Sequence, residues 1–221
     1  MEQYIYIFDY LARWGHYLAG ITWIGLLYYF NFVQGEYFKE ADGDARTDAF
    51  TKLVPRALWW FRWGAMFTFL TGCIMLGFKG ASVSLDLTIG AVLGTLMFLN
   101  VWLIIWPNQR IVIASNEQVK AGGEARPEAA AAAPKALLAS RTNTLFSLPM
   151  LFLMGSTMHL SGGHGLVGSS SMMALGVALV IVAALELNAI FGKQGPMTTV
   201  RGVIASGFGL TVVLWAVLDL L

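Results

Sequence analysis

Six runs of apolar residues, each 16 to 22 residues long, alternate with shorter polar segments along this chain. They cover residues 14–32, 57–78, 87–106, 145–160, 172–191 and 203–220. A helix of about 20 residues is long enough to cross the ~30 Å hydrocarbon core of a bilayer. Because lipid offers no partners to backbone N–H and C=O groups, each run is expected to be helical. The pattern therefore predicts an all-α, polytopic membrane helix bundle with about six transmembrane helices in a single domain, residues 1–221.

The composition agrees with a membrane protein. Of the 221 residues, 57% are hydrophobic and 12% are charged, whereas soluble domains have about 25% charged residues. The formal net charge is only +1, and the basic residues stand in short groups between apolar runs, so no nucleic-acid partner is expected. The single cysteine, Cys73, lies inside an apolar run, which excludes an intramolecular disulfide and a cysteine cluster for zinc.

Lysine and arginine residues gather in the connections that follow the first, third and fifth runs. These connections and their flanks hold twelve of the 14, and only Arg13 and Lys79 lie on the other side. The twelve are Lys39, Arg46, Lys52, Arg56, Arg62, Arg110, Lys120, Arg126, Lys135, Arg141, Lys193 and Arg201. Cytoplasmic loops carry such an excess of positive charge. Both termini are therefore predicted to be periplasmic, with the chain in the inner membrane of a bacterium.

Two local patterns add detail to this bundle. The longest connection contains the alanine-rich stretch AGGEARPEAAAAAPK, residues 121–135. Because such a segment has few side chains that build a core, residues 111–140 are predicted to form a cytoplasmic linker. The third run contains Gly90 and Gly94 in a GxxxG spacing, which allows another helix to approach closely.

Two histidines lie near the periplasmic ends of their helices, at similar predicted depths. His16 is close to the start of the first run, and His159 is close to the end of the fourth. Each has a glycine one turn deeper and an aromatic residue two turns deeper on the same face. These positions are Gly20 and Trp23 in the first run, and Gly155 and Phe152 in the fourth. Two histidines on facing helices commonly hold haem b, and a glycine leaves a flat space for the porphyrin.

An interfacial role for these histidines remains the alternative. A single boundary histidine often bonds a backbone carbonyl or a lipid headgroup, and the shared flanking pattern is what favours haem. His164 competes as a haem ligand, but it stands in the glycine-rich segment SGGHG and is predicted to lie on the surface of a loop.

A second group of polar residues is expected near the cytoplasmic ends of the helices. WPNQR ends the third run, RTN precedes the fourth, and Glu186 and Asn188 lie about one turn before the end of the fifth. Basic residues at the cytoplasmic membrane surface and aromatic residues at the membrane interface are usual in membrane proteins, and they explain most of the arginines and tryptophans here. It explains Glu186 less well, because a carboxylate inside a membrane usually has a function and a partner. Arg141 or Arg110 is the predicted partner, and Asn100 is predicted to make an interhelical hydrogen bond.

Four longer segments resemble a known family. RWGHYLAGITWIGLLYYFNFVQGE, PRALWWFRWGAMFTFLTG, NVWLIIWPNQR and RTNTLFSLPMLFLMGSTMH are similar to the membrane domain of the cytochrome-c-linked urate hydroxylases. The similarity extends through the fifth run. The first helix alone is also similar to membrane protoporphyrinogen oxidases, in which a first-helix histidine is associated with haem.

The resemblance implies an integral membrane oxidoreductase that takes electrons from cytosolic urate and passes them to a periplasmic cytochrome c. His16 and His159 occupy the family's histidine positions and would bind the iron of haem b. Anionic urate would bind among polar residues of the cytoplasmic end, with Glu186 accepting a proton and Arg141 and Arg110 completing the catalytic group. The substrate-binding residues would be Arg56, Asn108, Gln109, Asn143 and Asn188. The sequence has no CxxCH motif, so either the cytochrome is expected to be another subunit or this chain is expected to be a shorter paralogue of the family.

Two other functions stay open at this stage. The chain would equally serve as a haem-bearing anchor or electron-transfer subunit of a respiratory complex without catalysis of its own. A haem-free transporter of a purine-like anion is also compatible with six helices and a basic cytoplasmic mouth. Because the histidines and the polar group are expected at opposite faces, catalysis requires a second redox centre or a substrate site closer to the haem.

Overall fold

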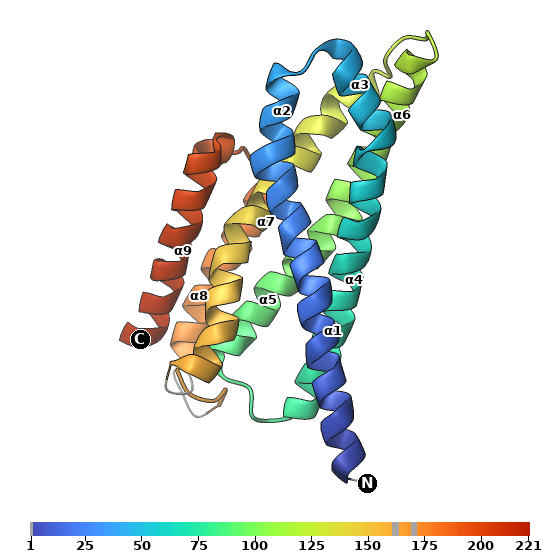
Figure 1. The fold of residues 1–221 in the computed structure, drawn as a ribbon. Coiled ribbons are helices and arrows are strands. Elements are labelled where there is room, and N and C mark those ends of the chain that lie inside the picture. Colours follow the sequence, from blue (N-terminus) through green and yellow to red (C-terminus); the bar gives the residue numbers. More distant parts are fainter. Residues whose placement is uncertain (1, 161–163, 169–171) are drawn as a thin grey trace.

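The computed structural model describes residues 2–160, 164–168 and 172–221, and its long elements are helices (Figure 1). The first stretch is continuous through α1 (Glu2–Tyr28), the π-helical segment η1 (Tyr29–Gln34) and α2 (Gly35–Glu40). The short α3 (Gly43–Lys52) leads to α4 (Val54–Lys79). The third long stretch joins α5 (Leu85–Leu99), the π-helical segment η2 (Asn100–Ile105) and α6 (Trp106–Lys120). It is followed by α7 (Glu128–His159), α8 (Met172–Phe191), the 3₁₀ turn η3 (Gly195–Thr198) and α9 (Val200–Leu220). The all-α prediction is confirmed for these residues.

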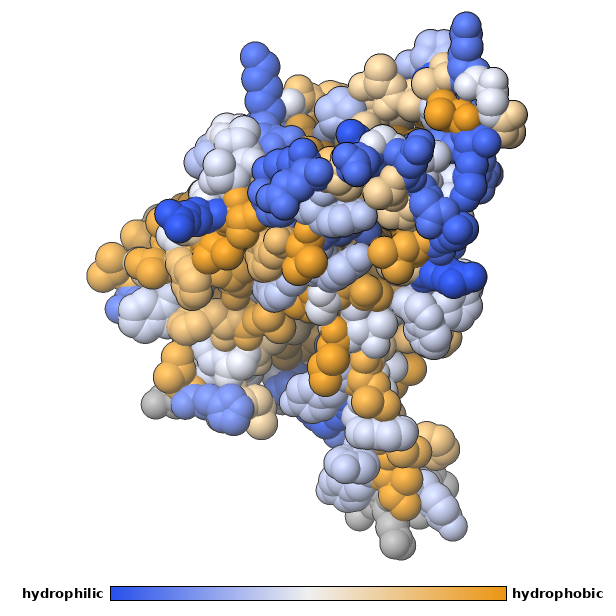
Figure 2. All heavy atoms as spheres, turned by 45° about the horizontal axis from the view of Figure 1, so that its top comes forward, coloured by the Kyte–Doolittle hydropathy of each residue, from blue (hydrophilic) through white to orange (hydrophobic). Residues whose placement is uncertain are grey.

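Successive long helices run in opposite directions, so α1 begins and α9 finishes at the same end of the bundle (Figure 1). The other end carries α2, α3 and the turn at 121–127, and most of the twelve basic residues identified from the sequence stand in or next to these segments and the turn after α8. We call these the opposite end and the basic end. Figure 2 shows hydrophilic side chains gathered over the basic end and apolar side chains on the flanks below it. A cytoplasmic location of the basic end remains a prediction.

Four helical stretches among the described residues are long and apolar enough to cross a membrane. They are Val54–Lys79, Leu85–Lys120, Met172–Phe191 and Val200–Leu220. The predicted spans at 14–32 and 145–160 belong to the first stretch and to α7, which are not among the four. α7 also carries the polar string RTNT, which lowers its hydropathy. The structure thus shows a membrane-type helical protein, and six spans stay a prediction.

The predicted linker at 111–140 is mostly helical, so that prediction was wrong. α6 continues to Lys120 and α7 begins at Glu128, which leaves only a short turn between them. Alanine has the highest intrinsic helix propensity, and the five alanines at 129–133 extend α7 towards the basic end. Ala132, Ala136 and Ala139 are buried, because their small side chains allow neighbouring helices to pack closely.

The GxxxG pattern of α5 makes the close helix contact that the sequence predicts. A Cβ placed on Gly90 would lie 2.9 Å from Met154 Cγ and 3.5 Å from Met150 O, both on α7. Gly94 faces the Met150 side chain, with a Cβ placed there lying 3.5 Å from its sulfur. These glycines let α7 pack along α5 with its backbone close to that of α5.

We expect Gly90→Ala to lower the stability of the folded bundle. The added methyl group would overlap Met154, and overpacking of this kind typically costs about 1–3 kcal/mol. Gly176→Ala on α8 is the matched control, because a Cβ at that position meets nothing within 4 Å. Thermal unfolding of the detergent-purified variants checks the prediction. A midpoint for Gly90→Ala equal to or above that of Gly176→Ala would contradict it.

Candidate functional site

α7 carries a run of polar side chains into the centre of the bundle. Arg141, Thr142, Asn143 and Thr144 are each at most 3% exposed. They lie around the middle of α7, and α7 as a whole contacts α5, η2, α6 and α9. Because protein surrounds these groups, they face neighbouring helices rather than lipid. Polar groups in such a setting mark functional sites in membrane proteins.

Asn143 is the centre of a hydrogen-bonded group that joins three helices. Its Nδ2 donates to Met97 O at 2.9 Å, and its Oδ1 accepts from Asn100 Nδ2 at 3.0 Å. Asn100 Nδ2 also donates to Glu186 Oε2 at 3.1 Å. Asn100, Asn143 and Glu186 lie 15, 16 and 14 residues from the ends of α5, α7 and α8 at the opposite end. At about 1.5 Å per residue they share one depth, roughly 20–24 Å from that end.

The interhelical hydrogen bond predicted for Asn100 is confirmed, whereas the ion pair predicted for Glu186 is absent among the described residues. Glu186 bonds Asn100 instead of Arg141 or Arg110. Arg110 is exposed on α6, and the carboxylate whose charge acts on Arg141 is Glu36 of α2.

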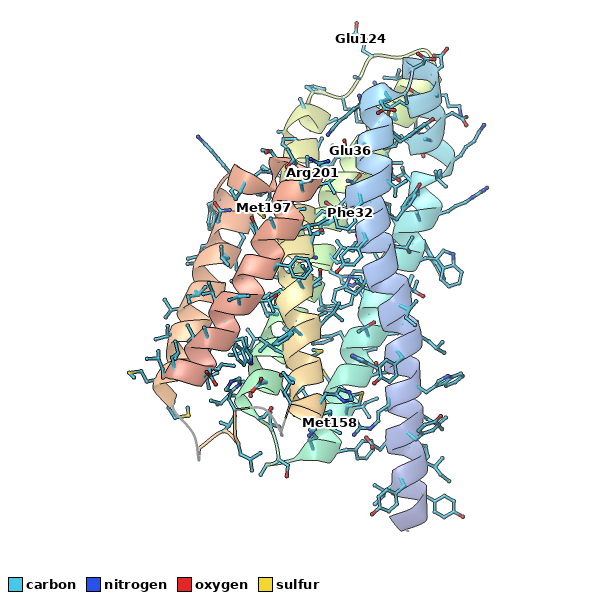
Figure 3. All side chains as sticks on the ribbon, turned by 60° about the vertical axis from the view of Figure 1, so that its left-hand side comes forward. Phe32, Glu36, Glu124, Met158, Met197 and Arg201 are labelled. Carbon is cyan, nitrogen blue, oxygen red and sulfur yellow. The ribbon has the colours of Figure 1, made fainter. Side chains whose placement is uncertain are left out.

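The first helix contributes polar groups to another side of α7. Tyr28 Oη and Ser147 Oγ are 2.9 Å apart, and Asn31 Nδ2 donates to Ser140 Oγ at 2.8 Å. Figure 3 shows Phe32 of η1 and Glu36 of α2 in the part of this continuous helical stretch that approaches the basic end. Met197 of η3 and Arg201 of α9 also lie towards the basic end. We call Asn31, Gln34, Asn100, Arg141, Asn143 and Glu186 the inner polar layer.

Both π-helical segments carry residues of the inner polar layer. Asn31 and Gln34 lie in η1, and Asn100 begins η2. A π turn is rare and frequently occurs at a functional site, because the extra residue changes which side chains face the interior. The presence of both segments at this layer points to a site rather than to ordinary helix packing.

Several buried atoms of the inner polar layer have no hydrogen-bond partner among the described residues. They are Asn31 Oδ1, Gln34 Oε1, and Nε and Nη1 of Arg141. Buried polar atoms are normally paired, because an unpaired one loses its hydration without compensation. The layer therefore contains both unused acceptors and an unused cation. An anionic ligand that also carries N–H groups would satisfy both.

The other residues predicted to bind substrate are distributed differently. Arg56 is exposed, and Asn188 bonds the backbone of Lys193 after the last turn of α8. Asn108 is half-buried and donates to Ile104 O at 2.7 Å, while the Oε1 atom of half-buried Gln109 has no partner among the described residues. Of the predicted residues, the structure thus gathers Arg141, Asn143 and Glu186 in the inner polar layer.

His16 is half-buried between α1 and α4, in the opposite half of the bundle. Its Nδ1 lies 3.1 Å from Thr71 Oγ1, and a Cβ on Gly72 would lie 3.3 Å from its Cε1. A Cβ on Gly20 would be 3.9 Å from a side-chain carbon of Thr68, and Trp23 is 2% exposed. α4 therefore covers the face of α1 that carries the predicted haem-binding positions.

His159 is the last residue of α7 and is exposed at the opposite end. Phe152 on the same helix is 39% exposed, and a Cβ on Gly155 would meet nothing within 4 Å. The two histidines thus have different surroundings. The helix face that carries His16 is packed against α4, whereas the face that carries His159 is exposed. Their shared role as haem ligands stays a prediction.

An apolar groove lies between α4 and α5 in the opposite half of the bundle. Its volume is about 490 Å³, within the range of about 300–1,000 Å³ found for ligand pockets. Leu76, one turn along α4 from Gly72 and the His16 ring, lines one part of the groove. Leu96, one turn along α5 from Asn100, lines another part. The residues that line the groove include neither His16 nor a member of the inner polar layer.

His164 is largely buried and hydrogen-bonded to Asp86, so its predicted position on the surface of a loop was wrong. Asp86 is fully buried and accepts three kinds of hydrogen bond. The donors are Ser156 Oγ at 2.6 Å, His164 N at 2.8 Å and His164 Nδ1 at 3.0 Å. The His164 side chain is 16% exposed, with Nε2 3.8 Å from the exposed carboxylate of Asp219. We call Asp86, Ser156 and His164 the outer latch, because they tie the loop after α7 to α5.

Comparison with known proteins gives one match. The sequence model of the family described as urate oxidase N-terminal matches residues 78–218, which is more than half of the chain. The chain belongs to the urate oxidase N-terminal family. No curated protein and no solved structure matches the sequence significantly.

The part matched by the urate oxidase N-terminal family begins at the end of α4 and includes α5, α7, α8 and most of α9. Four members of the inner polar layer lie within it, namely Asn100, Arg141, Asn143 and Glu186. His16, Asn31 and Gln34 lie before the matched segment. Asn31, Gln34 and Asp86 were not predicted as site residues, although each is a polar residue inside or at the edge of an apolar run.

Proposed function

We propose that this protein is a membrane-bound, urate hydroxylase-like oxidoreductase. It would oxidise urate at the inner polar layer and pass the electrons to a cytochrome c on the opposite side of a bacterial inner membrane. The observation that supports this most is Arg141, which is buried with two nitrogens unpaired among the described residues, in a segment that matches the urate oxidase N-terminal family. Family membership suggests the substrate, and the layer has the chemistry to bind it.

Urate is a planar anion with ring N–H groups and carbonyl oxygens, and the inner polar layer has complementary groups. The guanidinium of Arg141 would pair with an anionic oxygen, and charge-assisted hydrogen bonds of this kind are the strong ones. Asn143 and Asn100 are held by their mutual hydrogen bond, so they would present amide edges in a fixed orientation. Such preorganisation limits the entropy lost on binding.

Hydroxylation of urate adds a hydroxyl group from water and removes two electrons and two protons. Glu186 would accept a proton, and the hydrogen bond from Asn100 to its Oε2 atom supports this role by orienting the carboxylate. A carboxylate within hydrogen-bonding reach of the reacting group is a common general base. The two electrons would leave to two one-electron acceptors of the cytochrome c type, carried by another subunit.

A haem b would be held in the opposite half of the bundle, with His16 as one ligand. The groove between α4 and α5 is apolar, and His16 has its Nδ1 held by Thr71, which leaves Nε2 as the ligand atom. His159 would be the second ligand from α7. Haem b would supply one-electron transfer between the substrate and the cytochrome.

A reduced-minus-oxidised absorption spectrum of the detergent-purified protein tests this proposal. We expect a b-type spectrum, reduction of the oxidised protein by added urate, and loss of the haem absorbance in His16→Ala and His159→Ala. Met158→Ala is the matched control beside His159, because that side chain is 68% exposed. Reduction by urate reports catalysis, and the absorbance alone reports the ligands.

Two results would overturn parts of the proposal. Freshly prepared wild-type protein without haem would remove the cofactor assignment, and transport of urate in vesicles would then be measured. A haem that urate does not reduce would remove the urate oxidation and leave an electron-transfer subunit.

A further inference from the structure

The side chain of Asn31 is fixed in one orientation inside the bundle. It is 2% exposed, and its Nδ2 donates to Leu27 O at 2.9 Å and to Ser140 Oγ at 2.8 Å. A backbone carbonyl can only accept, so the nitrogen must be the atom beside Leu27 O. Both N–H groups of the amide are therefore used, and Oδ1 remains buried without a partner among the described residues.

A buried amide with a purely structural role is not expected to leave its carbonyl oxygen unpaired. A buried asparagine in a membrane helix usually stabilises the fold by pairing both its donor and its acceptor. Here the protein uses two partners to hold the amide and leaves its carbonyl oxygen free. Gln34, three residues further along the same π-helical segment, also has a buried, unpaired Oε1.

The free acceptors belong to the part of the bundle that holds the free cation. Ser140, the partner of Asn31, directly precedes Arg141 on α7. Arg141 is 3% exposed and has two nitrogens without partners among the described residues. It also interacts electrostatically with Glu36, which follows Gln34 by two residues on the first helix. The first helix and α7 thus offer acceptors and a cation at neighbouring levels of the bundle.

We propose that Asn31, with Gln34 beside it, determines substrate specificity by accepting hydrogen bonds from ring N–H groups of the ligand. This inference rests on the proposed function and defines the substrate class as planar anionic heterocycles that carry N–H donors. The anionic oxygen pairs with Arg141, and at least one ring N–H points to Asn31 Oδ1. The specificity residues of the first helix lie outside the segment that the family model matches.

Sites that hydrogen-bond a ligand group reject analogues that lack it, because the protein group is then buried unpaired. Equilibrium binding of urate and of its N-methylated derivatives to the detergent-purified full chain therefore tests the inference. We expect the wild-type protein to bind at least one monomethylated urate about tenfold or more weakly than urate. In Asn31→Ala this difference should fall to within about threefold.

Asn116→Ala is the matched control for Asn31→Ala. Asn116 is half-buried in α6, and its Nδ2 donates to Val112 O at 2.8 Å, the same bond to the preceding turn that Asn31 makes. This variant should keep both the affinity for urate and the discrimination. Gln34→Ala is a second test with less risk to folding, because it removes an Oε1 atom that has no partner among the described residues.

The possible failures are distinguishable. If the wild-type protein binds urate, and Asn31→Ala and Gln34→Ala both keep the wild-type discrimination, the specificity role is wrong and the proposed urate site stands. Equal affinity of the wild-type protein for urate and all its methylated derivatives would also overturn the role. If the wild-type protein does not bind urate, both the proposed function and this inference are wrong.

Discussion

Arg141→Met is expected to reduce kcat/KM for urate oxidation by roughly 30- to 4,000-fold, which corresponds to about 2–5 kcal/mol. The guanidinium is buried and has two nitrogens without partners among the described residues, so its charge is available to an anionic ligand. Removing one partner of a buried charge pair leaves the other charge uncompensated, which is why the expected loss is large. Methionine keeps the length and the apolar character of the arginine stem.

The same substitution is expected to leave the unliganded protein equally stable or slightly more stable. A buried cation without full pairing destabilises the fold, so its removal should not lower the midpoint of thermal unfolding. Arg201→Met at the start of α9 is the control, because Arg201 is an exposed arginine at the same end of the bundle. It should change neither activity nor stability.

Steady-state reduction of cytochrome c by urate, together with thermal unfolding, checks both expectations. Full turnover by Arg141→Met would remove Arg141 from the substrate site. A large loss of stability would instead make Arg141 a structural partner of Glu36, the carboxylate that interacts with it.

Asp86→Ala is expected to destabilise the protein by about 3–5 kcal/mol, because several donors would lose a buried acceptor and each such loss typically costs about 1–3 kcal/mol. Asp86 is fully buried and accepts from a side-chain hydroxyl, a backbone N–H and an imidazole, so all these donors would lose their acceptor. The loop that carries His164 would detach from α5, since the outer latch joins residues 78 positions apart in sequence.

Asp219→Ala provides the matched control for the outer latch. Asp219 is 53% exposed and stands 3.8 Å from the other side of the His164 ring, so its removal should have little effect. Thermal unfolding and the rate of proteolysis in the loop at 164–168 measure the two variants. An Asp86→Ala protein as stable and as protease-resistant as Asp219→Ala would show that the latch contributes little to stability.

Local sequence patterns predicted most of the helices and one of their contacts. Long apolar runs gave the membrane-type helices, and the glycine spacing at Gly90 and Gly94 correctly predicted a close helix pair. The alanine-rich stretch was misassigned because proline and glycine around it suggested a linker. The helix propensity of alanine and burial against neighbouring helices prevailed instead.

The candidate site was predictable in part. The strings around Arg141 and Asn143 and the carboxylate of Glu186 stand out in apolar surroundings, and the structure brings them together at one depth. Asn31 was missed because a single asparagine at the end of an apolar run resembles a boundary residue. Its role depends on Ser140, which lies 109 positions away in the sequence.

By itself, the sequence determined the helical class, the membrane-type character and the gathering of basic residues at one end of the bundle. These properties depend on hydrophobicity and charge counted along short segments, which do not require knowledge of neighbouring helices. Only the tertiary structure decided which polar side chains are buried, which remain unpaired, and that Asp86 holds His164. The physical reason is that burial and hydrogen bonding depend on which faces of distant helices meet.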